Sequence, residues 1–257
     1  MPSRPGPTTA ARAAVAAAAN ATKSLPASLL GASGTPGKTD GRKQRWEQHK
    51  EQRRTEFIDG TLSAVRELGP DIGMDEIAGH IGVSKTVLYR YFTDRNDLNT
   101  AAMIRFIEVS LLPQITEMLT DDVDDFSLTK RAIAGYVNAV ADDRAIYSFV
   151  TSNNAGPAAL ADSEKLVAQL VMYAMTDRLL ERDMDTAGVE TWSYALVGAI
   201  RLATHWWMVE EQLTAEQLID HLTIMVWGAI HGVMAVGGSA ELFNAIDHPS
   251  PTIRTAP

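Results

Sequence analysis

Apolar residues recur at helical spacing along most of the chain, and no segment shows the two-residue alternation of a strand. A first helix is predicted over Arg42–Leu68 and is stopped by Gly69-Pro70. Its apolar stripe consists of Phe57, Ile58, Leu62, Val65 and Leu68. Further helices are predicted over Met74–Ile81, a short piece ending at Phe92, Asp94–Leu119 with a kink at Pro113, Ser127–Ala141, Arg144–Ser152, Ala158–Arg182, Val189–Glu210 and Ala215–Val236. The pattern predicts an all-α fold.

The short helices at residues 74–92 form a candidate helix-turn-helix. Two helices of about eight residues joined by a tight turn, here Gly82-Val83-Ser84, pack at a steep angle. Leu88 and Phe92 are four residues apart and point together toward a small core. The open face then carries Lys85, Thr86, Tyr89, Arg90 and Tyr91. This arrangement predicts a second helix that enters a DNA major groove.

Each exposed position has a predicted DNA contact. Lys85 and Thr86 lie at the start of the second helix, where side chains reach base edges. Tyr89, Tyr91 and Arg95 are long enough to reach phosphates, which position the protein without reading sequence. The predicted DNA-binding residues are Arg53, Ser84, Lys85, Thr86, Tyr89, Arg90, Tyr91 and Arg95.

The run from Asp75 to Phe92 resembles the signature of the TetR family of transcriptional regulators. Ile77-Ala78, the Gly-Val-Ser turn and the Leu-Tyr-Arg-Tyr-Phe ending at Phe92 match it, and Phe57-Ile58-Asp59-Gly60 resembles the family's first helix. Tyr91 stands where His is commonest, and Gly73 where a hydroxyl residue often caps the helix. The resemblance implies a homodimer on a pseudo-palindromic double-stranded DNA operator, and a helical domain that binds a small-molecule effector.

Four regions follow from the motif and the composition. We expect a disordered basic tail at 1–40, a helix-turn-helix DNA-binding domain at 41–98, a helical ligand-binding and dimerisation domain at 99–238, and a flexible tail at 239–257, where Pro249 and Pro251 break any helix.

Charge is divided unevenly along the chain, whose formal net charge is −9. Residues 1–54 carry ten basic and three acidic residues, whereas residues 111–257 carry eight and twenty. The basic N-terminal segment predicts binding to an anion such as the phosphate backbone of DNA, and the acidic remainder is expected to have a different function.

Large, soft side chains on the later helices predict a ligand cavity, with plain core packing as the alternative for each residue. The predicted ligand-binding residues are Phe106, Tyr147, Phe149, Met172, Met175, Trp192, Arg201 and Trp206. Arg201 lies in an apolar helix and needs a partner, either an anionic ligand group or an acid of this chain or of a second subunit. The segment Val197–Trp207 resembles the corresponding helix of actinobacterial regulators that respond to long-chain acyl-CoA. That weaker resemblance makes a long acyl compound the first candidate effector.

The last two long helices are expected to form the dimer interface, as the family resemblance implies. Gly228 permits close helix approach, and Trp227 and His231 lie beside it. Packing within one subunit is the alternative.

Other functions find little support in the composition. The chain has no cysteine, and its six histidines are scattered, so we expect no metal or other cofactor. It has no phosphate-binding glycine loop and no nucleophile elbow, so we expect no enzyme activity. The apolar stretches are interrupted by Arg201, His205, Gly228 and His231, so we expect a cytoplasmic protein rather than a membrane protein.

Three functions remain open at this point. The first is a ligand-responsive regulator, most simply a repressor. The second is a helical enzyme or carrier for a lipid-like substrate with a degenerate helix-turn-helix. The third is a DNA-binding module that answers to a partner protein instead of a ligand.

Overall fold

The computed structural model describes residues 41–111, 113, 123–151 and 157–248. Every regular element within these ranges is helical, which confirms the predicted all-α fold. The elements are α2 (Gly41–Leu68), α3 (Met74–Ile81), α4 (Lys85–Leu88), α5 (Arg95–Phe106), η1 (Ile107–Leu111), α7 (Asp125–Asp142), α8 (Arg144–Thr151), α9 (Pro157–Leu180), α10 (Val189–Glu210), α11 (Ala215–Ala235) and α12 (Ala240–Ala245).

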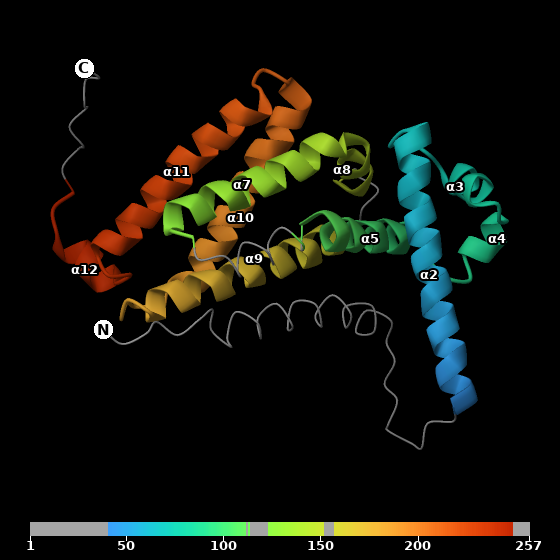
Figure 1. Cartoon of the computed structure of the whole chain (residues 1–257), viewed down its shortest axis with the longest axis horizontal. Helices are drawn as coiled ribbons and strands as arrows, with labels where there is room; N and C mark the ends of the chain where they lie inside the picture. Colours follow the sequence, from blue (N-terminus) through green and yellow to red (C-terminus); the bar gives the residue numbers. More distant parts are fainter. Residues whose placement is uncertain (1–40, 112, 114–122, 152–156, 249–257) are drawn as a thin grey trace.

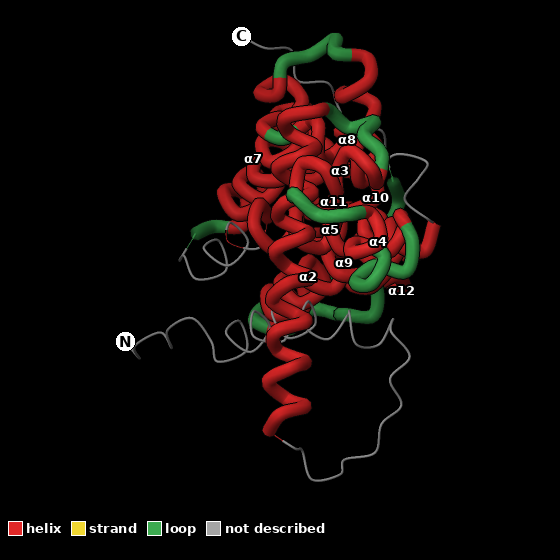
Figure 2. The backbone as a smooth tube through the Cα atoms, turned by 90° about the vertical axis from the view of Figure 1, so that its right-hand side faces the viewer, coloured by secondary structure: helices red, strands yellow, loops and turns green. Residues whose placement is uncertain are grey.

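A small helical head sits at one end of an elongated bundle (Figure 1). Helix α2 crosses that end and contacts α3, α5 and α8, and the end-on view shows α3 and α4 at the surface of the head (Figure 2). In the bundle, α9 packs along α10 and α7 packs along α11. The short helix α12 lies at the opposite end from α3 and α4 (Figure 1).

The head is held together by the apolar positions that the sequence pattern selects. Phe57, Leu62, Val65, Ile77, Leu88, Phe92 and Leu98 are all buried in one cluster. Gly82 ends α3 in the left-handed conformation at φ 77°, which glycine adopts without steric cost. Ser84 then turns the chain into the predicted second helix, α4. This helix ends at Leu88 rather than at the predicted Phe92, and hydrogen-bonded turns continue the chain to Phe92.

Gly60 allows α2 and α3 to approach closely. A Cβ added there would lie 2.8 Å from Cγ1 of Ile81. We expect Gly60→Val to destabilise the protein by about 1–3 kcal/mol, because over-packing forces side chains and backbone apart. Urea denaturation of the full chain measures this change, and Gly79→Val, where an added Cβ meets nothing, is the control. An equal loss in both variants would contradict the packing argument.

The structure differs from the predicted elements in three further places. The predicted helix start at Asp94 makes Thr93 the cap, whereas in the structure Asp94 itself caps α5, because its carboxylate accepts the Asp97 N–H. The helix predicted to continue from residue 94 to 119 changes to π geometry at Ile107–Leu111, just before Pro113, which has no N–H to extend the ladder. Residues 1–40 and 114–122 lie outside the described part of the chain.

The third difference falls in the predicted flexible tail. Ser239 accepts a hydrogen bond from the Leu242 N–H and starts α12, before the proline residues that suggested a tail. Residues 249–257 are outside the described part.

Helix α11 is long and apolar enough to cross a membrane by length and composition, with a mean hydropathy of 1.4 over its most apolar window. The polar residues and glycine that interrupt the apolar stretches predict no membrane-spanning helix, so a helix this apolar was not expected from the sequence. Length and composition alone are weak evidence, because core and interface helices pass the same test.

Candidate nucleic-acid interface and ligand cavity

The predicted recognition face is open to solvent. Ser84, Lys85, Thr86, Tyr89 and Arg90 are exposed around α4, while Leu88 beneath them is fully buried. Nζ of Lys85 lies 2.7 Å from Asp75, and this hydrogen bond raises the pKa of Lys85. A phosphate or base acceptor would replace Asp75 as the partner of this charge.

Three predicted DNA contacts are also tied into the head. Tyr91 packs edge-on against Phe57 with ring centroids 5.0 Å apart. Arg53 pairs with Glu56 at 2.9 Å. The guanidinium of Arg95 lies 5.9 Å from the Phe149 ring. Each has a structural contact already, and phosphate contact remains a prediction for all three.

Arg54 and Asp97, which no sequence pattern singles out, hold the head together internally. Their side chains form an ion pair at 2.5 Å, are 12% and 19% exposed, and lie 43 residues apart in sequence. Asp97 also accepts the Thr93 N–H at 2.9 Å, and Arg54 covers the ring of Phe92 at 4.4 Å. Arg54 belongs to the basic N-terminal segment, but its spacing gives no sign of this partner.

An apolar cavity of about 420 Å³ lies between the bundle helices. Of the predicted ligand-binding residues, five lie on its wall: Phe106, Tyr147, Met175, Trp192 and Arg201.

The other three predicted ligand-binding residues need correction, because none lies on the wall. Phe149 is buried in the core that joins α8 to the head, on the side that meets Arg95. Trp206 is 45% exposed on α10. Met172 is half-buried on α9. The sequence shows that these side chains are large and apolar, but it does not show which face of each helix lines the cavity.

One side of the cavity carries a polar cluster, defined here as Tyr136, Tyr147, Glu164 and Arg201. Nε of Arg201 lies 2.5 Å from Oε1 of Glu164, so the arginine has its partner within this chain. Tyr147 is 5% exposed, and its hydroxyl has no hydrogen-bond partner of good geometry among the described residues. Burial raises the pKa of both tyrosines, well above the ordinary range for Tyr136.

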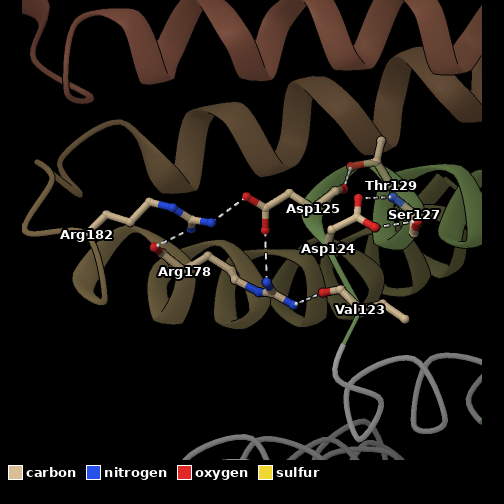
Figure 3. A network of polar contacts seen from close by, with 7 residues as sticks. All are labelled: Val123, Asp124, Asp125, Ser127, Thr129, Arg178 and Arg182. Carbon is tan, nitrogen blue, oxygen red and sulfur yellow. Dashed lines mark hydrogen bonds and ion pairs between the residues drawn. The ribbon is translucent and has the colours of Figure 1, made fainter. Parts of the chain in front are cut away.

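A second polar group lies where α7 meets the end of α9 (Figure 3). Asp125 accepts from Arg178 at 2.9 Å and from Arg182 at 2.6 Å. Asp124 caps α7 by accepting the Ser127 N–H at 2.9 Å. Asp124 therefore caps the helix, and Asp125, Arg178 and Arg182 are all paired within the chain.

The raised tyrosine pKa values make stability sensitive to alkali. A phenol whose pKa is raised by folding stabilises the fold below the unfolded pKa of about 10, and the contribution is lost as pH rises through the folded pKa. We expect the free energy of unfolding to fall more steeply above pH 10 in the wild type than in Tyr136→Phe/Tyr147→Phe. Denaturation at pH 8 and at pH 10.5 to 11 measures it, and parallel losses in both proteins would refute the expectation.

Part of α11 presents a surface with small and apolar residues. Gly228 and His231 are exposed, and Trp227 packs between the rings of Phe126 and His231 at 5.3 and 4.8 Å. A Cβ added at Gly228 or Gly232 would meet nothing within 4 Å. The surface lacks a partner among the described residues of this chain.

Sequence comparison gives the decisive observation. No protein-family model matches the chain. The uncharacterized HTH-type transcriptional regulator Rv0472c of Mycobacterium tuberculosis is 47% identical over 218 residues, which cover 84% of this chain and 93% of that protein. The chain belongs to the TetR family of helix-turn-helix transcriptional regulators.

A more distant relative and two solved structures are also similar to the chain. The HTH-type transcriptional activator FasR of Mycolicibacterium smegmatis is 23% identical over 169 residues, 63% of this chain and 74% of its own. A TetR-family regulator from Rhodococcus superposes with a TM-score of 0.55 at 18% identity, covering 72% of this chain and 99% of its own. The fatty acid degradation regulator FadR of Bacillus halodurans superposes with a TM-score of 0.53 at 16% identity, covering 67% of this chain and 93% of its own. The proteins that match the chain are named as regulators rather than as enzymes.

Proposed function

We propose that this TetR-type regulator is a cytoplasmic homodimer that represses transcription from a pseudo-palindromic operator and is released by a hydrophobic small molecule. The observation that carries the proposal is an exposed recognition face on α4 combined with an apolar cavity in the same subunit. Residues 41–98 would form the DNA-binding domain and residues 99–238 the ligand-binding and dimerisation domain. The similarity to the fatty acid degradation regulator FadR supports a long acyl compound as the first candidate effector.

The contacts of α8 offer a route from cavity to DNA. Tyr147 lies on the cavity wall, whereas Phe149 of the same helix is buried in the core that includes the head. Beside α8, Asp143 accepts two hydrogen bonds from Arg66 of α2, at 3.0 and 2.6 Å to Oδ2. A ligand that moves α8 would therefore tilt α2 and change the separation of the two heads in a dimer.

Binding to DNA from just upstream of the protein's own gene tests the proposal. We expect a complex whose affinity falls at least 100-fold between 50 and 200 mM salt, because neutralised phosphates release counterions. Palmitoyl-CoA at submillimolar concentration should release the DNA. Binding that ignores palmitoyl-CoA would discard the acyl effector and retain the regulator.

Absence of binding at low salt by a confirmed dimer would contradict the choice of operator. A genome-wide selection of bound fragments would then decide whether the protein has any operator. Failure there too would favour the enzyme-or-carrier function.

A further inference from the structure

We infer that the polar cluster of the cavity recognises a neutral oxygen acceptor on an apolar ligand, such as the carbonyl of an ester, and discriminates against a free carboxylate. The inference rests on the proposed ligand-binding role of the cavity and specifies which head group it accepts. It stands on the placement of four side chains, each from a different helix.

Convergence of four helices makes the cluster a built site. Tyr136 comes from α7, Tyr147 from α8, Glu164 from α9 and Arg201 from α10, and all four lie on the wall of one cavity. The rest of the wall is formed mainly by aliphatic, aromatic and methionine side chains, apart from the Asp125 network at the other polar group. An apolar pocket with a few converging polar groups is the usual design of a small-molecule site.

The available hydrogen-bond donor is the Tyr147 hydroxyl. Its side chain is 95% buried. The Tyr136 hydroxyl lies beside the Tyr147 hydroxyl, but no described residue meets the geometry of a hydrogen bond to it. A buried polar group left unpaired is unfavourable, and a ligand oxygen in the cavity would relieve this. Burial raises the pKa of Tyr147, so the phenol keeps its proton and can donate a hydrogen bond.

The charge on Arg201 is already balanced. Glu164 lies 2.5 Å from its Nε, so the pair as a whole is neutral. A ligand carboxylate that approached Arg201 would also meet the carboxylate of Glu164, in a site walled by apolar atoms where like charges repel strongly. A neutral carbonyl meets no such repulsion. Glu164 thus acts as a specificity residue that excludes anionic head groups.

Two probes with the same chain length test the inference by isothermal titration calorimetry on the full-length protein at pH 8. Methyl laurate presents a neutral carbonyl and laurate a carboxylate. We expect methyl laurate to bind at least ten-fold more tightly than laurate. Tyr147→Phe should weaken methyl laurate about five-fold or more, the loss of one hydrogen bond to a buried group. Tyr173→Phe makes the same chemical change at an exposed position of α9 and should leave binding unchanged.

Glu164→Gln is the second variant and predicts a change of opposite sign. Removing the carboxylate leaves the charge of Arg201 unbalanced, so the affinity for laurate should rise ten-fold or more. The preference for methyl laurate over laurate should then disappear or reverse. The inference is overturned if laurate binds the wild type as tightly as methyl laurate, if Tyr147→Phe has no effect on methyl laurate, or if neither probe binds. Operator binding is measured on the same preparations without ligand, so a failed head-group inference is separable from a failed regulator.

Discussion

Ile224→Glu is expected to dissociate the dimer and, with it, to remove operator binding. The side chain of Ile224 is 71% exposed in the single chain, and Met225 beside it is 49% exposed. Exposure of large apolar residues on α11, next to two glycines with open space above them, fits a helix face that a second subunit covers. Two-fold symmetry would bury two unpaired carboxylates in one interface. We expect the dissociation constant of the dimer to rise by at least 100-fold, which corresponds to about 3 kcal/mol of lost association free energy.

Operator binding follows because each head reads only one half-site, and a monomer loses the second. Analytical ultracentrifugation measures the dimer, and fluorescence anisotropy measures DNA binding at the same concentrations. Leu180→Glu is the control, since Leu180 is 63% exposed at the end of α9, a different helix from the proposed interface. An Ile224→Glu protein that remains dimeric with wild-type affinity for DNA would place the interface on another surface.

Periodicity was sufficient for most of the long helices, and the exception is the pattern from residue 94 to 119, which changes to π geometry at Ile107–Leu111. The starts of α10 and α11 and both bounds of α3 agree with the prediction, because caps and glycine breaks are local signals. Where two local signals competed, sequence did worse. Thr93 and Asp94 are both good caps, and the choice of Asp94 reflects a carboxylate that reaches the Asp97 N–H.

The sequence could not predict which charged residues pair, because the partners lie on different helices. Arg201 and Glu164 lie on different helices, and their pairing depends on how α9 packs along α10. The same holds for Arg54 and Asp97, 43 residues apart. Helical spacing correctly marked Tyr147 as inward-facing, yet it gave Phe149 the same role. The two side chains leave α8 on different sides, one to the cavity and one to the head.

The second large effect is expected at the recognition face. Lys85→Ala/Tyr89→Phe should lower operator affinity by at least 100-fold, because it removes one charge at the groove-facing end of α4 and one hydroxyl within reach of a phosphate. The fold should survive, since the Lys85 side chain is 46% exposed and Tyr89 is 44% exposed. Its helical circular dichroism and unfolding temperature should match those of the wild type.

The control for this variant repeats the same chemistry away from the head. Lys165→Ala/Tyr173→Phe changes an exposed lysine and an exposed tyrosine of α9. Net charge falls equally in the two double variants, so a general electrostatic effect would weaken DNA binding equally in both. A loss confined to Lys85→Ala/Tyr89→Phe, with a shallower dependence on salt, would show that α4 itself lies in the groove. Wild-type affinity in that variant would show instead that α4 does not read the operator, and the DNA contacts would then have to come from the basic part of α2.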